Sequence, residues 1–150
     1  MDTNFAAMYE HFTSGFKTAA ATIAGAPVEI RYQGNVYDSE PARDKYWVRL
    51  STVTLRSEQA TLSTSASELG KKRYKVRGMI FAQVFGPRQT IGANEKCGEL
   101  AYLARTILRK NPPQYDANVW FTNATTENLE PTDNWLRWDT SASFTFDEFQ

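Results

Sequence analysis

Apolar and polar residues alternate most regularly between Lys71 and Lys110, and this stretch predicts a strand followed by a helix. The residues on one face of the alternating pattern are Tyr74, Val76, Ile80, Ala82 and Val84. The other face begins polar and turns apolar from Met79 onward. We therefore expect the strand, over 74–85, to be covered on both sides in its second half and to lie centrally in a sheet.

The segment after this strand predicts an amphipathic helix. Gly86-Pro87 interrupts the strand pattern, and apolar residues then recur at spacings of three and four. The apolar stripe consists of Cys97, Leu100, Ala101, Ala104, Ile107 and Leu108. We expect Thr90 or Asn94 to cap this helix, and Pro112-Pro113 to stop it.

The N-terminal part predicts another helix and a short strand. Over residues 4–24 one helical face carries Phe5, Met8, Phe12, Phe16, Ala19 or Ala20, and Ile23. Gly25-Ala26-Pro27 ends this helix. Residues 28–32 alternate as a strand, with a turn at 33–35.

Residues 46–55 predict a second strand, rich in aromatic and β-branched side chains. Its alternation changes phase near Thr52, and a β-bulge there is one explanation. Residues 57–70 are small and polar without a sustained period, so we expect a long loop between two strands of a hairpin.

The C-terminal third predicts two more strands. The first covers 118–121 and is followed by a polar stretch over 123–134. The second covers 143–149, and residues 135–139 lead into it. The fold class is therefore α+β: a mixed or antiparallel sheet of about five strands backed by two helices, in the order α-β-β-β-α-β-β.

Length and charge narrow the classes of function. A chain of 150 residues is expected to form one domain, 1–150. Lys+Arg and Asp+Glu number 17 each, and the resulting net charge of zero argues against a general binder of nucleic acid or anionic membranes. One cysteine, no basic leader and no long apolar run lead us to expect an intracellular protein without a disulfide or a membrane span.

The residue types that usually carry catalysis are scarce. His11 and Cys97 both fall within predicted helices and form no convincing nucleophile pair, and they are too few for a structural zinc site. Residues 86–92 precede a helix but lack the spacing and the Gly-Lys-Ser/Thr of a phosphate-binding loop. We therefore predict no catalytic residue, no cofactor and no metal site.

Two features remain as candidates for binding. The densest positive charge lies in Lys71, Lys72, Arg73, Lys75 and Arg77. This band is either a solvated strand face or a surface that meets nucleic acid or an acidic partner. Trp135 and Trp138 point to opposite faces if they lie in a strand, and each either fills a core or anchors an interface.

The order of these patterns resembles the small tail terminator, or tail completion, proteins of long-tailed bacteriophages, over about residues 5–149. The resemblance rests on four stretches: residues 27–32, residues 46–50 with the segment 59–63, residues 77–87 with Gly92 and the helix behind it, and Trp135-Leu136-Arg137-Trp138 before a Phe-rich strand. The Ser- and Ala-rich segment around 63–70 differs from the shorter versions expected in that family.

The resemblance implies a structural protein of the virion with no enzymatic activity. Proteins of this kind form a hexameric ring that caps the tail tube, stops its polymerisation and presents the head-joining surface. The implied partners are copies of the chain itself, the tail tube protein and a head–tail connector or stopper protein, with DNA only passing through the lumen and no membrane involved. Assembly is then expected in the host cytoplasm, at the head-proximal end of the tail.

Within such a ring we expect Lys71, Lys72, Arg73, Lys75 and Arg77 to lie near the lumen. The candidate interface residues are Gln59, Leu62, Trp135, Trp138 and Phe149. Three alternatives remain: a head-to-tail stopper or other minor tail protein, a small-ligand-binding α+β domain, and a hydrolase with a carboxylate site.

Overall fold

The computed structural model describes residues 3–62, 72–112 and 118–149. Its elements, in chain order, are α1 (Thr3–Ala24), β1 (Glu29–Tyr32), β2 (Trp47–Leu62), β3 (Lys72–Pro87), α2 (Ala93–Leu108), β4 (Val119–Thr132) and β5 (Trp135–Phe149). The five strands form one sheet in the order β1-β2-β3-β5-β4. Among the strand pairs of these described residues, only β1–β2 is parallel. The predicted α+β class and element order are confirmed.

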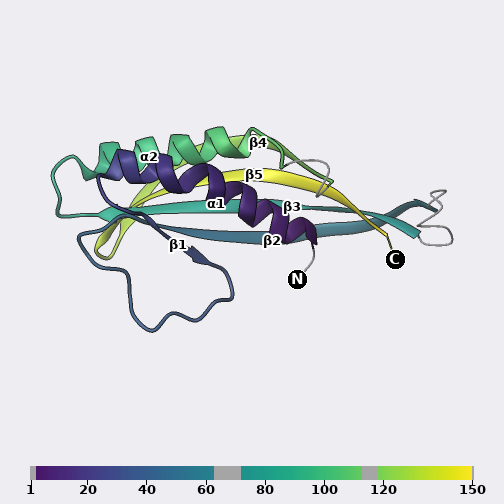
Figure 1. Ribbon diagram of the computed structural model, residues 1–150, viewed down its shortest axis with the longest axis horizontal. Coiled ribbons are helices and arrows are strands. Elements are labelled where there is room, and N and C mark those ends of the chain that lie inside the picture. Colours follow the sequence, from purple (N-terminus) through teal and green to yellow (C-terminus); the bar gives the residue numbers. More distant parts are fainter. Residues whose placement is uncertain (1–2, 63–71, 113–117, 150) are drawn as a thin grey trace.

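Both helices cover the same face of the sheet, which we call the helix face (Figure 1). The predicted stripe of α2 is buried in full, and α1 buries Met8, Phe12, Phe16 and Ala20. Of the two alternatives in α1, Ala20 is buried whereas Ala19 is exposed. Burial of each large aliphatic or aromatic side chain contributes about 1.5–3 kcal/mol, so this layer holds the sheet and the helices together.

β3 is the central strand, as its sequence predicts. It pairs with β2 on one side and with β5 along its whole length on the other. Val76, Ile80, Ala82 and Val84 lie buried on the helix face, and Phe85 is buried on the opposite face, which we call the open face. Coverage of the second half on both sides is therefore found at Phe85, whereas Met79 and Phe81 are only half-buried.

Three strands are longer than their sequence patterns indicate. Residues 57–62, predicted as part of a loop, continue β2 and pair with β3. The polar residues 123–132 continue β4, and 135–149 form one strand without interruption. These segments lack apolar alternation because little covers them: the paired ends of β2 and β3 extend beyond α1 (Figure 1), and β4 is a sheet edge.

One local prediction is confirmed only in part, and another was wrong. β2 has register shifts between Thr54 and Arg56 and between Gln59 and Thr61, and the first of these lies just beyond Thr52, near which a bulge was predicted. Val53 and Leu55 are apolar but do not signal a phase change: they are 46% and 66% exposed. The N-cap residue of α2 is Gly92, at φ 80°. Neither Thr90 nor Asn94 caps the helix with its side chain, contrary to the prediction. Asn94 instead accepts a hydrogen bond from the Trp138 indole N–H at 3.1 Å.

At Gly78 the two strands that pair with β3 come so close that no side chain fits. A Cβ atom at this position would collide with the backbone carbonyl oxygen of Val53 and with the ring of Phe144. Neither neighbour can move freely, since Val53 belongs to a paired strand and Phe144 is 1% exposed. The position therefore requires glycine.

We expect Gly78→Ala to lower the free energy of unfolding by about 2 kcal/mol or more, because the added methyl group overpacks a rigid contact. Urea unfolding followed by circular dichroism measures this change. Gly15→Ala in α1 is the matched control: its Cβ would lie 3.3 Å from the side chain of Ile107, which would need to shift by only a few tenths of an ångström, and the change should stay within about 1 kcal/mol. Equal effects of the two substitutions would contradict this packing argument.

Candidate assembly surfaces

The predicted basic residues lie near the start of β3. Here the paired ends of β2 and β3 extend beyond α1, and we call this part of the sheet the projecting end (Figure 1). Arg73, Lys75 and Arg77 share the open face, with Arg77 exposed and the other two half-buried. Lys72 belongs to the strand, and Lys71 lies outside the described residues. The structure thus brings three of these cations together on one face.

Acidic side chains flank this basic band. Lys75 pairs across β2 with Glu58 and across β5 with Asp147. Glu58 also receives an ion pair from Arg56 at 3.1 Å, between two well-exposed side chains. The band is therefore a mixed surface with an excess of positive charge. Two of its polar atoms, Arg73 Nε and Asp147 Oδ1, are buried without a hydrogen-bond partner among the described residues.

The predicted interface residues form two separate groups. Gln59, Leu62 and Phe149 lie on the strands at the projecting end, and Gln59 is exposed. Trp135 and Trp138 lie at the other end of the sheet. They point to opposite faces, as predicted: Trp135 contacts Trp47 on the open face, and Trp138 contacts α2. Both tryptophans are half-buried.

A cluster of aromatic and arginine side chains on the open face was missed by the sequence analysis. Trp47 stacks on Phe85 with ring centroids 4.3 Å apart, and Trp135 meets Trp47 edge-on at 5.9 Å. Guanidinium groups lie over these rings: Arg31 over Trp47 at 5.7 Å, and Arg49 and Arg137 over Phe85 at 5.6 and 5.9 Å. Cation–π contacts of this kind stabilise by about 0.5–1 kcal/mol at exposed sites.

A row of hydrogen-bonded polar side chains crosses β2, β3 and β5 beside the cluster. Arg49 Nε donates to Gln83 Oε1 at 2.7 Å, and Gln83 Nε2 lies 3.5 Å from Asp139 Oδ2. Arg137 donates to both carboxylate oxygens of Asp139, at 2.9 and 3.0 Å. This hydrogen bonding, helped by the opposite charge and opposed by burial, raises the pKa of Arg137. The signal was present in the sequence: Trp47-Val48-Arg49 and Trp135-Leu136-Arg137 each place a ring and a guanidinium on one strand face.

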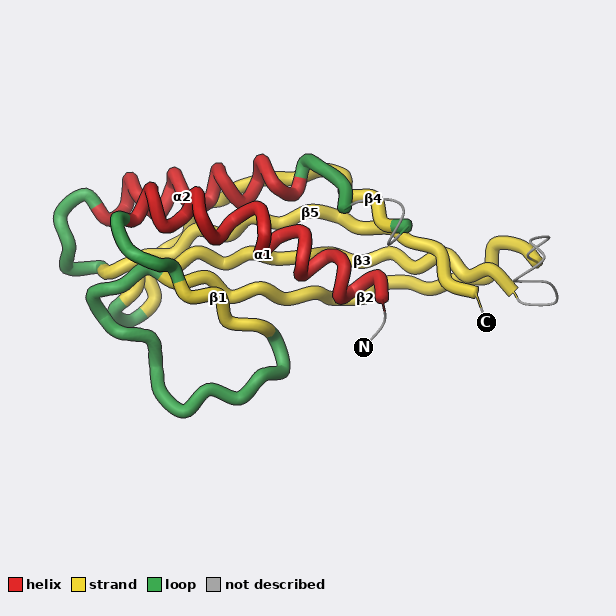
Figure 2. Tube along the Cα trace, viewed as in Figure 1, coloured by secondary structure: helices red, strands yellow, loops and turns green. Residues whose placement is uncertain are grey.

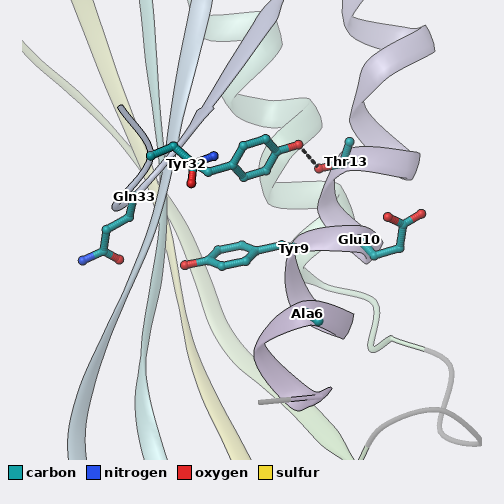
Figure 3. Close-up of a pocket in the computed structure, with 7 residues that line it drawn as sticks. Ala6, Tyr9, Glu10, Thr13, Tyr32 and Gln33 are labelled. Carbon is teal, nitrogen blue, oxygen red and sulfur yellow. Dashed lines mark hydrogen bonds between the residues drawn. The ribbon is translucent and has the colours of Figure 1, made fainter. Parts of the chain in front are cut away.

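Two hollows border the end of β1. One, of about 520 Å³, lies on the open face between Arg31, Tyr37, Trp47 and Arg49. The other, of about 290 Å³, lies between α1 and the end of β1 and is lined by Ala6, Tyr9, Glu10, Thr13, Tyr32, Gln33 and Asn35 (Figure 3). The Thr13 and Tyr32 hydroxyls are hydrogen-bonded at 2.8 Å across it. Neither hollow contains a cluster of catalytic side chains among the residues that line it.

The β1 side of the sheet leaves a long part of β2 without a neighbouring strand. β1 pairs only with Trp47–Leu50, and the connection after it turns away past the edge of the sheet (Figure 2). Beyond β1, the Gln33 side chain satisfies one backbone amide of β2, since its Oε1 accepts a hydrogen bond from the Thr52 amide at 3.0 Å. From Val53 onward, β2 has no strand on this side within the described part of the chain.

β4 forms the opposite edge of the sheet. At its start, side chains occupy the outward amides: Asn111 Oδ1 accepts from Phe121 at 2.9 Å, and Asn4 Oδ1 accepts from Asn118 at 3.3 Å. A bulge follows between Thr122 and Thr125, and Asn123 adopts φ 56°. Beyond it, residues 125–132 pair only with β5.

The two side chains considered for chemistry have structural contacts. His11 Nε2 lies 3.1 Å from the carbonyl oxygen of Ile107, so the ring links α1 to the end of α2. Cys97 is fully buried beneath Gly86 and Tyr46, and burial raises the pKa of its thiol to about 12. A thiol in this state is a poor nucleophile.

Across residues 3–62, 72–112 and 118–149, no three His, Cys, Asp or Glu side chains are grouped so that they could hold a metal ion. None of the helices in those ranges combines the length and apolar character that crossing a membrane requires.

No family model and no curated protein sequence matches this chain. A solved structure that carries no functional description is similar over 95% of this chain and 94% of its own, with a TM-score of 0.62 and 13% identity. A chain from the virion of a native gene transfer agent particle matches at a TM-score of 0.47 and 12% identity, over 95% of this chain and 93% of that one. The first match supports the fold alone, and the second has too low a TM-score to establish a shared fold.

Burial of Cys97 predicts a specific dependence of stability on pH. An unfolded cysteine has a pKa near 8.5, whereas the folded pKa is about 12. Because folding disfavours the thiolate, the stabilisation is fully present below about pH 8.5 and is lost as the pH rises towards 12. We expect urea unfolding of the wild type to show this loss, and Cys97→Ala to show a smaller one. Rapid reaction of the native thiol with a thiol reagent at pH 8 would contradict its burial.

Proposed function

We propose that residues 1–150 form one tail-terminator-like domain, a structural protein of a phage virion without enzymatic activity. In this proposal six copies form a ring that caps the tail tube, stops its polymerisation and provides the surface for a head–tail connector or stopper protein. The observation that carries it is the resemblance described above over residues 5–149, whose described residues lie mostly in the sheet and in α2.

The architecture supports a role in side-by-side assembly. Each edge of the sheet has a stretch with no neighbouring strand on its outer side within the described residues: residues 53–62 of β2 and 125–132 of β4. We call these stretches the unpaired parts of β2 and β4. The open face exposes Val53, which is 46% accessible, and Trp120, which is 43% accessible. Strand edges and exposed aromatic side chains are features that protein partners commonly bind.

In the ring we place the projecting end of the sheet near the lumen, where DNA passes. The support is the exposed Arg77 beside Lys75 and Arg73 on one strand face. The acidic neighbours Glu58 and Asp147 reduce the net charge of this surface, which suits transient passage better than tight binding. A ring structure with these side chains on the outer wall would overturn this placement.

One feature favours a second candidate, a small-ligand-binding domain. The hollow of about 520 Å³ has the size of a ligand pocket and is lined by aromatic and arginine side chains. In the terminator proposal the same side chains serve to stabilise the open face.

Light scattering after size-exclusion chromatography, with negative-stain microscopy, separates the two candidates. The terminator proposal predicts six-fold rings that form in solution or on added tail tubes. A chain that stays monomeric, ignores tubes and binds a small molecule would favour the binding domain.

Deletion of the gene separates a terminator from a head-to-tail stopper. Loss of a terminator should give abnormally long tail tubes, because nothing stops the addition of tube subunits. Loss of a stopper should leave free tails of normal length, and that result would contradict the proposal. Complementation with the wild-type gene is the control.

A further inference from the structure

We propose that the unpaired part of β4 in one copy pairs, antiparallel, with the unpaired part of β2 in the next copy, so that the sheets of the ring join edge to edge. This inference rests on the proposed function and names the surfaces that would close the ring. Its occupant is a second copy of this chain.

The two edges are suited to a closed ring because they differ. A contact between two unlike surfaces of the same chain is head-to-tail, and repetition of such a contact closes a ring when the rotation permits. β2 and β4 lie on opposite sides of the sheet, separated by β3 and β5 (Figure 1). Each copy therefore offers two different edges, β4 for the next copy on one side and β2 for the next copy on the other.

Strand direction also fits. β3 is antiparallel to both β2 and β5, and β4 is antiparallel to β5, so β4 runs opposite to β2. Rotation about an axis that follows the strands preserves their direction. β4 of one copy would therefore meet β2 of the next as an antiparallel pair, which is the arrangement of every other long pair in the sheet.

The side chains along the two edges are complementary. Residues 125–132 of β4 carry the acids Glu127 and Glu130 and no basic residue, with Leu129 between them. Glu127 and Leu129 pair with Asp139 and Arg137 and so lie on the open face. On β2, the open face presents exposed Arg56, and Val53 and Leu55 are exposed nearby.

One register brings these groups together. With Glu127 opposite Arg56, Leu129 falls beside Val53 and Leu55, and Glu58 faces the neutral Thr125. Opposite charges and apolar side chains that face each other across paired strands stabilise the pairing. The exposed apolar residues of β2 are thereby covered.

This register requires an offset between copies, and the offset is physically reasonable. Within one copy, Glu127 lies level with Arg49, and Arg56 lies six rungs further along β3, at Arg77. Six rungs correspond to about 20 Å. The strands that repeat around the ring are β2, β3, β5 and β4, with a width of about 19 Å, because the neighbour's β4 would lie beside β2 in line with β1. If successive copies lie at the same height, the ring then needs its strands tilted by about 45°, which is at the upper end of the range of closed β-barrels.

Local structure limits the pairing to these segments. β1 already occupies Trp47–Leu50, and the Gln33 side chain covers the Thr52 amide. The start of β4 is covered by Asn111 and Asn4. In the proposed register β4 of the neighbour continues along β2 just where β1 ends.

Charge reversal tests this pairing. Arg56→Glu and Glu127→Arg should each reduce ring formation, raising the concentration needed for half-assembly by about tenfold, since each opposes like charges across the joint. The double variant should restore assembly to the wild-type level. Glu95→Arg, at an exposed position in the first turn of α2, is the control and should assemble normally.

Removal of one edge donor provides an independent variant. Amide directions alternate along a strand, so the Thr54 amide points to the same side as that of Thr52, away from β3. Thr54→Pro should block assembly and leave the monomer folded by circular dichroism, whereas Thr54→Ala should assemble. Light scattering and native mass spectrometry measure both series.

The outcomes separate the two proposals. Rings that form in the wild type and persist in the single charge reversals and in Thr54→Pro would overturn the edge pairing and leave the proposed function intact. Failure of the wild type to form rings, alone or on tail tubes, would overturn both. Disruption by the single reversals without rescue in the double variant would also overturn the Glu127–Arg56 register.

Discussion

The structure depends on the burial of one sheet face beneath two helices, with β3 at its centre. β3 is bonded to strands on both sides and carries Val76, Ile80, Ala82 and Val84 against α1 and α2. Close contacts at Gly78 and Gly86 leave no room for a side chain at these two positions of the strand. Because the helices supply apolar cover on one side only, the other face and both edges have to be stabilised differently.

The open face is stabilised by polar and aromatic contacts. The stacked Trp47 and Phe85 lie beneath guanidinium groups, and Asp139 holds Arg137 by two hydrogen bonds. Each contact is weak, but together they stabilise the open face. Further along, Val53 and Leu55 are left exposed on β2. Edges of this kind are a liability in an isolated chain and an asset in one that assembles.

The sequence predicted those parts of the fold that are set by apolar periodicity. The stripe of α2, the centre of β3 and the class and order of the elements all follow from side chains that must leave water. It failed at residues 57–62 and 123–132, where strands are held by backbone pairing with small polar side chains and have no apolar face. The N-cap of α2 at Gly92 requires a positive φ. A glycine allows this conformation, but its presence in the sequence does not predict it.

The candidate surfaces were predicted less completely. Grouping of Arg73, Lys75 and Arg77 follows from alternation along one strand, and so does the opposite orientation of Trp135 and Trp138. The aromatic–arginine cluster joins residues from four strands, β1, β2, β3 and β5, and its assembly depends on a register that no single stretch of sequence reveals. The unpaired edges depend on where β1 ends, which is likewise a property of the whole sheet.

The most direct measurement is a cryo-electron microscopy map of the assembled ring, at a resolution that separates strands. The account predicts six copies whose sheets are continuous, with β4 of each copy lying against β2 of the next beyond Thr52. A ring held together through α1 and α2, with both sheet edges facing solvent, would contradict it.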